Sequence, residues 1–260
     1  MKLTQNELNE FNTNGFLVLR NFLDKASCEA ILDVALAHLK HKVEPIESEI
    51  DYGTKSEAYR RDITDYNSIE NKKTSTVRRL RQVYDRDILF KNWMENKKIR
   101  PILRQVLFDE VVLTTAHHNS IMTKLPNQST ETSWHQDRRY WSYDDNNLVS
   151  IWLALGEENN ENGVLEFIPK SHRLSFSKEQ FGEKEYFKED NVKNLELIKS
   201  KCSTFLETGD VVIFHCKLLH RANKNNSLKP KVSFVYTVKG KKTNALKGSR
   251  SSEYREILLG

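Results

Sequence analysis

The chain has 260 residues and a formal net charge of +5. This length can bury a sizeable core in one domain, and the absence of a dense basic tract argues against a nucleic-acid partner. No segment approaches the roughly 18 consecutive apolar residues of a membrane-spanning helix, and the three cysteines lack metal-binding spacing and leave one unpaired. We therefore expect a single cytoplasmic domain, 1–260, whose oligomeric state the sequence leaves open.

The first elements are predicted from a capping pattern and from apolar periodicity. Thr4 with Glu7 three residues later forms a capping box that opens a short helix. Residues 16–19, after Gly15, are predicted to form a strand, and residues 23–39 have the apolar repeat of a helix that packs on the outside of a β-structure.

The middle of the chain alternates polar and periodic segments. Residues 41–75 are polar and predict a long mobile excursion, which could serve as a lid. Residues 85–107 predict a helix that Pro101 should interrupt, and residues 110–125 predict two strands. The charged segment 175–201 is predicted to be partly helical and to lie beside or over the mouth of a site.

The most informative pattern is Trp134-His135-Gln136-Asp137, followed much later by Leu219-His220. Side chains at i and i+2 of a strand share a face, so His135 and Asp137 can converge on one metal ion. His220 follows a buried-strand pattern and can supply a third ligand. Two imidazoles and one carboxylate on one face of Fe(II) leave open positions, as an oxygen-activating non-heme iron enzyme requires.

Other histidines compete for these roles. His215 is the alternative for the distal ligand, but no basic residue follows it at the expected spacing, so a supporting or core position is favoured. His117 and His118 are adjacent and would face opposite sides of a strand, where a structural role is favoured over a place in the cavity.

A basic residue and a hydroxyl follow on the next predicted strand. Lys231 and Ser233, in the segment KVSFVYTV, can point to the same face of a cavity. An ammonium and a hydroxyl there would bind the distal carboxylate of a dicarboxylate cosubstrate whose 2-oxo acid end chelates the iron.

Three stretches resemble the phytanoyl-CoA dioxygenase family of Fe(II)/2-oxoglutarate oxygenases. They are FNTNGFLVLRNFLDKASCEAIL, SWHQDRRYW with LVSIWLALGEENNENGVLEFIPKSHR, and GDVVIFHCKLLHRANKNNSLKPKVSFVYT. The resemblance covers nearly the whole chain and is weakest at residues 39–75. It implies a mainly β fold with flanking helices, a double-stranded β-helix of the jelly-roll or cupin-like kind.

The resemblance also implies roles for individual residues. Iron would be bound by His135, Asp137 and His220. Lys231 stands where the family more often has arginine to hold the 2-oxoglutarate tail, so a two-pronged contact becomes a point charge. Ser233 would assist it, and Gln136 and Trp152 would border the cosubstrate. Because the metal carboxylate is present, hydroxylation is favoured over the halogenation found in members that lack it.

The expected activity is hydroxylation of an aliphatic C–H bond with Fe(II), 2-oxoglutarate and O2, which releases succinate and CO2. A small or lipid-linked anionic substrate is favoured, with 3-deoxy-manno-octulosonic acid of lipopolysaccharide as the specific candidate and a peripheral contact with the inner membrane surface left open. The alternatives are a natural product, an amino acid or an acyl thioester as substrate, or a non-catalytic jelly-roll metal-binding protein. Lys231 and Ser233 argue against the last, and against a cupin-type isomerase.

Substrate contacts are predicted just after the metal pair. Arg138 and Arg139 follow the metal pair directly, and strand alternation would turn one of them into the cavity to meet an anionic group. Tyr140 beside them would stack on the substrate. A second cluster, Arg78, Arg79 and Arg81, is more simply interpreted as solvated surface charge.

Overall fold

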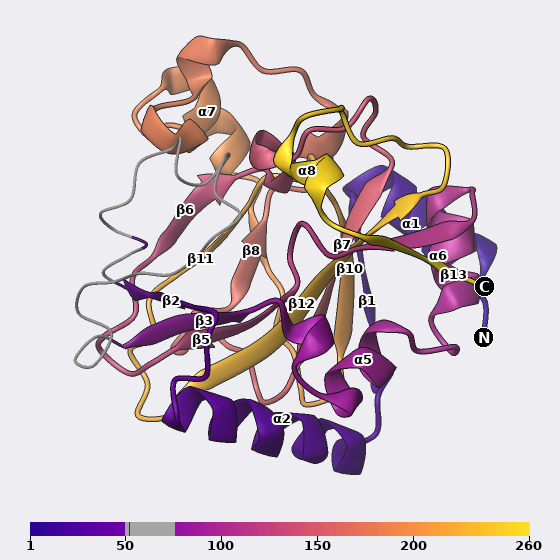
Figure 1. Cartoon of the computed structure of the whole chain (residues 1–260). Coiled ribbons are helices and arrows are strands. Elements are labelled where there is room, and N and C mark those ends of the chain that lie inside the picture. The colour runs from indigo at the N-terminus through magenta and orange to yellow at the C-terminus, as the bar shows by residue number, and fades with distance from the viewer. Residues whose placement is uncertain (50–51, 53–75) are drawn as a thin grey trace.

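The computed structural model describes residues 1–49, 52 and 76–260 (Figure 1). Its helices are α1 (Gln5–Asn14), α2 (Lys25–Lys40), α5 (Ile88–Met94), α6 (Arg100–Leu107), α7 (Val192–Ile198) and α8 (Arg250–Glu253). The strands of the larger sheet are β1 (Phe16–Leu19), β2 (Ile46–Ser48), β3 (Val77–Arg81), β4 (Val111–Thr114), β5 (Ser120–Lys124), β7 (Leu148–Ala154), β10 (Val211–His215), β12 (Lys231–Gly240) and β13 (Glu256–Leu259). The smaller sheet contains β6 (Thr132–His135), β8 (Leu165–Phe167), β9 (Cys202–Ser203) and β11 (His220–Ala222).

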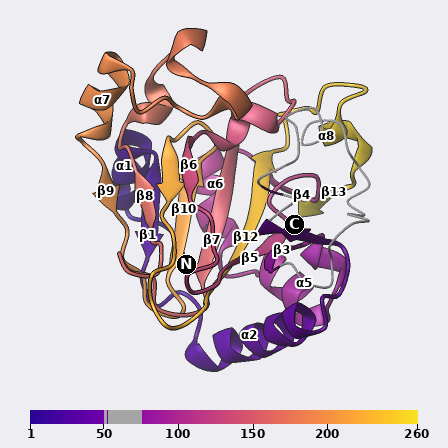
Figure 2. The same ribbon diagram turned by 90° about the vertical axis from the view of Figure 1, so that its left-hand side faces the viewer.

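Two antiparallel sheets form the centre of the molecule. The larger sheet has the order β1-β10-β7-β12-β5-β3-β2, with β4 and β13 attached beside β12, and the smaller has the order β6-β11-β8-β9. Together with the flanking helices they form the predicted jelly roll. Figures 1 and 2 show α2 at the opposite end of the molecule from α7.

Period-2 alternation in the larger sheet builds two cores. On β7, Val149, Ile151 and Leu153 belong to a core shared with residues of α1, α2, α5 and α6. Trp152 and Ala154 belong to a second core that β8, β10 and β11 also line. Because both faces of β7 are covered, the strand is buried along its whole length. The second core and the site described below lie between the sheets.

Most predicted elements are confirmed. The capping box of Thr4 and Glu7 opens α1, and the strand at residues 16–19 and the two strands within 110–125 are present. The helix predicted for 85–107 is two helices, and Pro101 lies in the first turn of α6 rather than at the break. Proline is tolerated there because the first-turn N–H groups have no helical partner.

The predicted excursion at 41–75 is corrected at its beginning. Residues Ile46–Ser48 form β2, which pairs with β3. Residues 50–51 and 53–75, and with them most of the predicted excursion and lid, lie outside the described residues. Among the described helices, none combines the length and apolar character needed to cross a membrane.

Candidate active site

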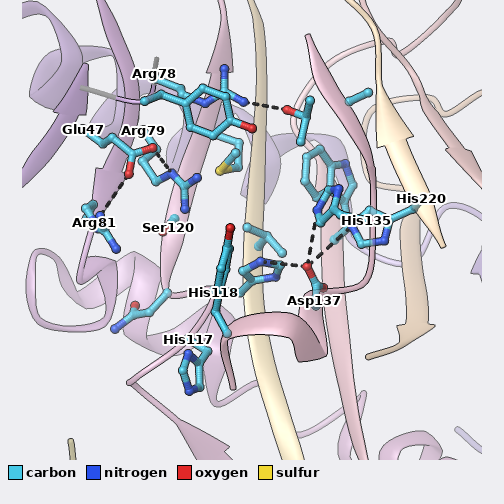
Figure 3. Close-up of a pocket in the computed structure, with 18 of the residues that line it drawn as sticks. Glu47, Arg78, Arg79, Arg81, His117, His118, Ser120, His135, Asp137 and His220 are labelled. Atoms are coloured by element: carbon cyan, nitrogen blue, oxygen red, sulfur yellow. Dashed lines mark hydrogen bonds and ion pairs between the residues drawn. The ribbon is translucent and has the colours of Figure 1, made fainter. Parts of the chain in front are cut away.

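His135, Asp137 and His220 come together on the inner side of the smaller sheet. His135 ends β6 and His220 begins β11, and these two residues are cross-strand partners. One potential ligand atom from each of the three residues lies within 4.8 Å of the others, and all three side chains are buried. Figure 3 shows their side chains pointing toward one another.

The local structure around Asp137 differs from the prediction. The extended strand ends at His135, and Asp137 is the first residue of a 3-10 helix, η2 (Asp137–Tyr140). Its Oδ1 nevertheless lies 3.8 Å from His135 Nε2 and 3.5 Å from His220 Nε2. Convergence therefore depends on the turn after β6 and not on i, i+2 alternation within one strand.

Hydrogen bonds orient both imidazoles toward the centre of the site. The Nδ1 atoms of His135 and His220 lie 2.8 Å from Ser133 O and 2.9 Å from Leu218 O. A carbonyl only accepts, so each Nδ1 carries the proton and each Nε2 presents a lone pair. Burial lowers the pKa of both imidazoles, which favours this neutral form.

The carboxylate is held in its ionised form. Burial alone would raise the pKa of Asp137, but the imidazoles of His118 and His220 outweigh it and lower that pKa. Ser150 Oγ donates a hydrogen bond of 2.8 Å to Asp137 Oδ2. Two neutral imidazoles and one carboxylate on neighbouring segments are a donor set suited to Fe(II).

His118 contacts this centre, which the sequence did not indicate. Its Nε2 lies 3.2 Å from Asp137 Oδ1, and its Nδ1 lies 3.2 Å from Ser150 Oγ. His117 and His118 lie in the loop between β4 and β5, where His118 has a φ of 34°, and both line the cavity. The expected strand alternation does not apply to them.

His215 is not part of the centre. It ends β10, and its Nδ1 accepts a 3.1 Å hydrogen bond from the backbone N–H of Lys217. Its ring packs 5.3 Å from that of His172, and burial lowers the pKa of His215 to about 3. It does not line the cavity around the triad.

Lys231 and Ser233 lie on β12 as predicted, but an internal carboxylate contacts both. Lys231 Nζ lies 3.0 Å from Glu158 Oε2 and donates to Gly163 O at 2.6 Å. Glu158 Oε1 accepts from Ser233 Oγ at 2.6 Å and from Trp152 Nε1 at 2.9 Å. Glu158 is fully buried, so Lys231 is not the isolated cation that the sequence suggested.

A second lysine, Lys124, ends β5 directly beside Lys231 on β12. Its Nζ donates to Thr130 O at 2.8 Å, and it is buried and lines the cavity. Burial, followed by the charges of Arg78 and Lys231, lowers its pKa to about 6. One sequence feature could have identified Lys124 as a cavity residue. It is the last residue of the strand SIMTK and lies on the same face as Ser120 and Met122.

Only some of the other residues predicted to contact substrate or cosubstrate line the cavity. Arg139 and Tyr140 line the cavity, together with Trp152. Arg138 turns away, because its guanidinium donates to Asn146 Oδ1 at 2.7 Å and Tyr143 O at 2.6 Å. The amide of Gln136 likewise donates to Lys217 O, so Gln136 does not border the cavity and its predicted cosubstrate contact is corrected.

The arginine cluster expected on the surface lies inside the site instead. Arg78, Arg79 and Arg81 all line the cavity. In the pairing of β2 with β3 the register shifts at Arg78, which has no opposite partner on β2. Such a bulge re-aims neighbouring side chains, so both Arg78 and Arg79 reach the space between the sheets.

The family model named Phytanoyl-CoA dioxygenase (PhyH) matches residues 11–233. The chain therefore belongs to the phytanoyl-CoA dioxygenase family, and it is an Fe(II)- and 2-oxoglutarate-dependent dioxygenase. The match includes all three triad residues and both residues of the Lys-x-Ser pair.

Curated relatives and solved structures agree with this membership. An ectoine dioxygenase of Bordetella bronchiseptica is 24% identical over 94% of this chain and 77% of its own. The human peroxisomal phytanoyl-CoA dioxygenase is 28% identical over 43% of this chain and 35% of its own. EctD from S. alaskensis has a TM-score of 0.72 at 19% identity, covering 94% of this chain and 80% of its own. The epimerase SnoN, in complex with Fe3+, alpha ketoglutarate and nogalamycin RO, also has a TM-score of 0.72. Its sequence identity is 14%, and the match covers 93% of this chain and 85% of its own.

Proposed function

We propose that this chain hydroxylates an aliphatic C–H bond of a small acid, with His135, Asp137 and His220 as the iron ligands. The observation that carries the proposal is the convergence of two Nε2 lone pairs and one carboxylate within 4.8 Å in a buried cavity. Bound Fe(II), with 2-oxoglutarate and O2, would supply the oxidising chemistry and release succinate and CO2. The protein positions the substrate and excludes water.

The 2-oxoglutarate tail would bind between Lys124 and Lys231. When Lys124 is protonated as the tail binds, these two ammonium groups and the Glu158 carboxylate together carry a net charge of +1, which one distal carboxylate neutralises. Glu158, supported by Ser233 and Trp152, holds Lys231 in place. In this proposal Ser233 acts through Glu158 instead of binding the cosubstrate itself.

The charge of the cavity supports an anionic substrate. Among the residues that the structure describes, its lining includes the guanidinium groups of Arg79, Arg81, Arg139 and Arg250, while Glu47 and Asp137 are the acidic side chains. Arg139 and Tyr140 are the proposed substrate contacts beside the iron ligands. The lipid-linked candidate, 3-deoxy-manno-octulosonic acid, is an acid of this class. The name of the Bordetella bronchiseptica relative, ectoine dioxygenase, points to a small molecule and favours a free acid first.

A substrate screen by mass spectrometry tests the proposal. The protein is incubated with Fe(II), 2-oxoglutarate and a panel of small acids and their neutral analogues. We expect a product heavier by one oxygen atom, formed only when both Fe(II) and 2-oxoglutarate are present, together with succinate. Metal binding without any succinate formation, with or without added acids, would favour the non-catalytic alternative.

A further inference from the structure

The three cavity arginines of β3 differ in what they bind. Arg78 is almost fully buried, and its guanidinium contacts Glu49 at 3.0 Å and donates to Thr130 Oγ1 and Thr132 Oγ1 at 2.6 Å each. These contacts tie β3 to the segment that leads into β6. Arg78 is therefore a structural residue.

Arg79 has spare binding capacity. Its Nε lies 3.0 Å from Glu47 Oε1, and among the described residues its Nη1 and Nη2 atoms have no hydrogen-bond or ion-pair partner. Its side chain is only 19% exposed. Solvent in the cavity reaches Nη1 and Nη2, so their N–H donors are available to a ligand.

Glu47 fixes the direction in which Arg79 binds. Its second oxygen, Oε2, lies 3.1 Å from Arg81 Nη1, so one carboxylate holds two arginines. Figure 3 shows Glu47 on one side of the Arg79 guanidinium, with the other nitrogens turned away from it, across the cavity from the triad. The edge formed by Nη1 and Nη2 is thus presented as a two-pronged donor.

Resting on the proposed function, we propose that Arg79 is the substrate-specificity residue of this enzyme and binds a carboxylate of the substrate. The edge of Arg79 that Glu47 leaves open has two parallel N–H donors, which match the two oxygens of one carboxylate. The carbon that is hydroxylated then lies between this carboxylate and the triad.

Calorimetry with defined probes tests the proposal. The protein is loaded with Fe(II) and 2-oxoglutarate without oxygen and titrated with cyclohexanecarboxylate and gluconate. Cyclohexanecarboxamide, glucose and glucose 6-phosphate are the matched probes. We expect the carboxylates to bind best, and Arg79→Gln to weaken them at least tenfold, as loss of a charged hydrogen-bond pair predicts. Arg138→Gln, the same substitution outside the cavity, should bind them as the unaltered protein does.

Three results would overturn the proposal: no carboxylate binds, Arg79→Gln binds them unchanged, or glucose 6-phosphate binds better than the carboxylates. If Arg79→Gln does not fold, Arg79→Lys keeps the charge but loses the two-pronged edge, and it should weaken the carboxylates several-fold; unchanged affinity would again contradict the role. Succinate formation without added substrate is measured in parallel. This reaction needs only iron and 2-oxoglutarate. Its absence would therefore contradict the proposed function and not the role of Arg79.

Discussion

At the scale of single residues, the site is organised by a few buried charges that compensate one another. Asp137 is surrounded by three imidazoles, and Lys231 is paired with Glu158. Within the part of the chain that the structure describes, Lys124 Nζ has only carbonyl oxygens as hydrogen-bond partners. Because unpaired buried charge is costly, the lysine without a carboxylate is the natural counterion for an incoming one. The anchoring of 2-oxoglutarate should therefore involve both lysines.

Removing the ammonium group of either Lys124 or Lys231 should weaken the binding of 2-oxoglutarate. In Lys124→Ala and Lys231→Ala the KM for 2-oxoglutarate should rise at least tenfold, since each loses a charged hydrogen bond to the tail. Lys231→Arg should have a much milder effect. Steady-state kinetics with the exposed-residue control Lys229→Ala measures this. A normal KM in Lys231→Ala would move the anchor elsewhere.

The depressed pKa of Lys124 predicts a pH dependence of stability. Its pKa is about 6 in the folded chain and about 10.4 when unfolded, so between these values the unfolded chain binds more protons. Burial of the protonated Lys124 lowers the free energy of unfolding by its full amount below pH 6. This loss of stability becomes smaller as the pH rises toward 10. Lys124→Met, which has no such charge, should exceed the unaltered protein in Tm most at pH 6 and progressively less at pH 8 and 9. A constant difference would show that the lysine is not desolvated.

At the scale of elements, the Glu158–Lys231 pair joins the segment after β7 to the start of β12. The strands β7 and β12 are paired, and Trp152 and Lys231 on them line the cavity. Glu158 also accepts from Trp152 on β7, so one carboxylate connects two strands and the loop between β7 and β8. The pair therefore contributes both to folding and to the shape of the cosubstrate site.

Glu158→Gln should be destabilising and should respond more strongly to 2-oxoglutarate. It leaves a buried ammonium without its partner, which costs about 3–5 kcal/mol in comparable pairs. The cosubstrate carboxylate can replace the lost charge, so the rise in Tm on adding 2-oxoglutarate should be larger than in the unaltered protein. Differential scanning fluorimetry with the exposed neighbour Glu157→Gln as control measures it. If 2-oxoglutarate raised the Tm of both variants equally, Glu158 would have no role in the cosubstrate site.

The sequence predicted elements and ligands whose signals are local. The capping box of α1, the alternating strands and the triad residues all follow from short patterns. The pairing of Glu158 with Lys231 and the entry of Arg79 into the cavity could not be predicted in this way. The first depends on contacts between segments 73 residues apart in sequence, and the second on a register shift between β2 and β3.

At the scale of the whole molecule, two sheets enclose a cavity, with the triad on the smaller sheet and the turn that follows β6, and Arg79, Lys124 and Lys231 on the larger sheet. The strands β3, β5 and β12 are neighbours in the larger sheet, so Arg79, Lys124 and Lys231 lie on one continuous wall. This arrangement separates the proposed sites for iron, cosubstrate tail and substrate acid. An acid should reach such a cavity faster at low ionic strength.

Turnover of an acidic substrate should therefore fall as salt is added, mainly through kcat/KM. Arg139→Gln should lower kcat/KM for the same substrate while iron and 2-oxoglutarate binding stay intact. Arg138→Gln, whose guanidinium lies outside the cavity, should do little. Equal and negligible effects of the two substitutions, with no salt dependence, would return the choice of substrate to neutral molecules.

The central claim is that His135, Asp137 and His220 form an iron centre that also binds 2-oxoglutarate. Anaerobic titration of the protein with Fe(II) and 2-oxoglutarate, followed by the visible charge-transfer absorption of the chelate, tests it most directly. The account predicts that the band forms in the unaltered protein and in His215→Ala, and is lost in His135→Ala, Asp137→Ala and His220→Ala. A band that survives in His220→Ala but disappears in His215→Ala would contradict the account.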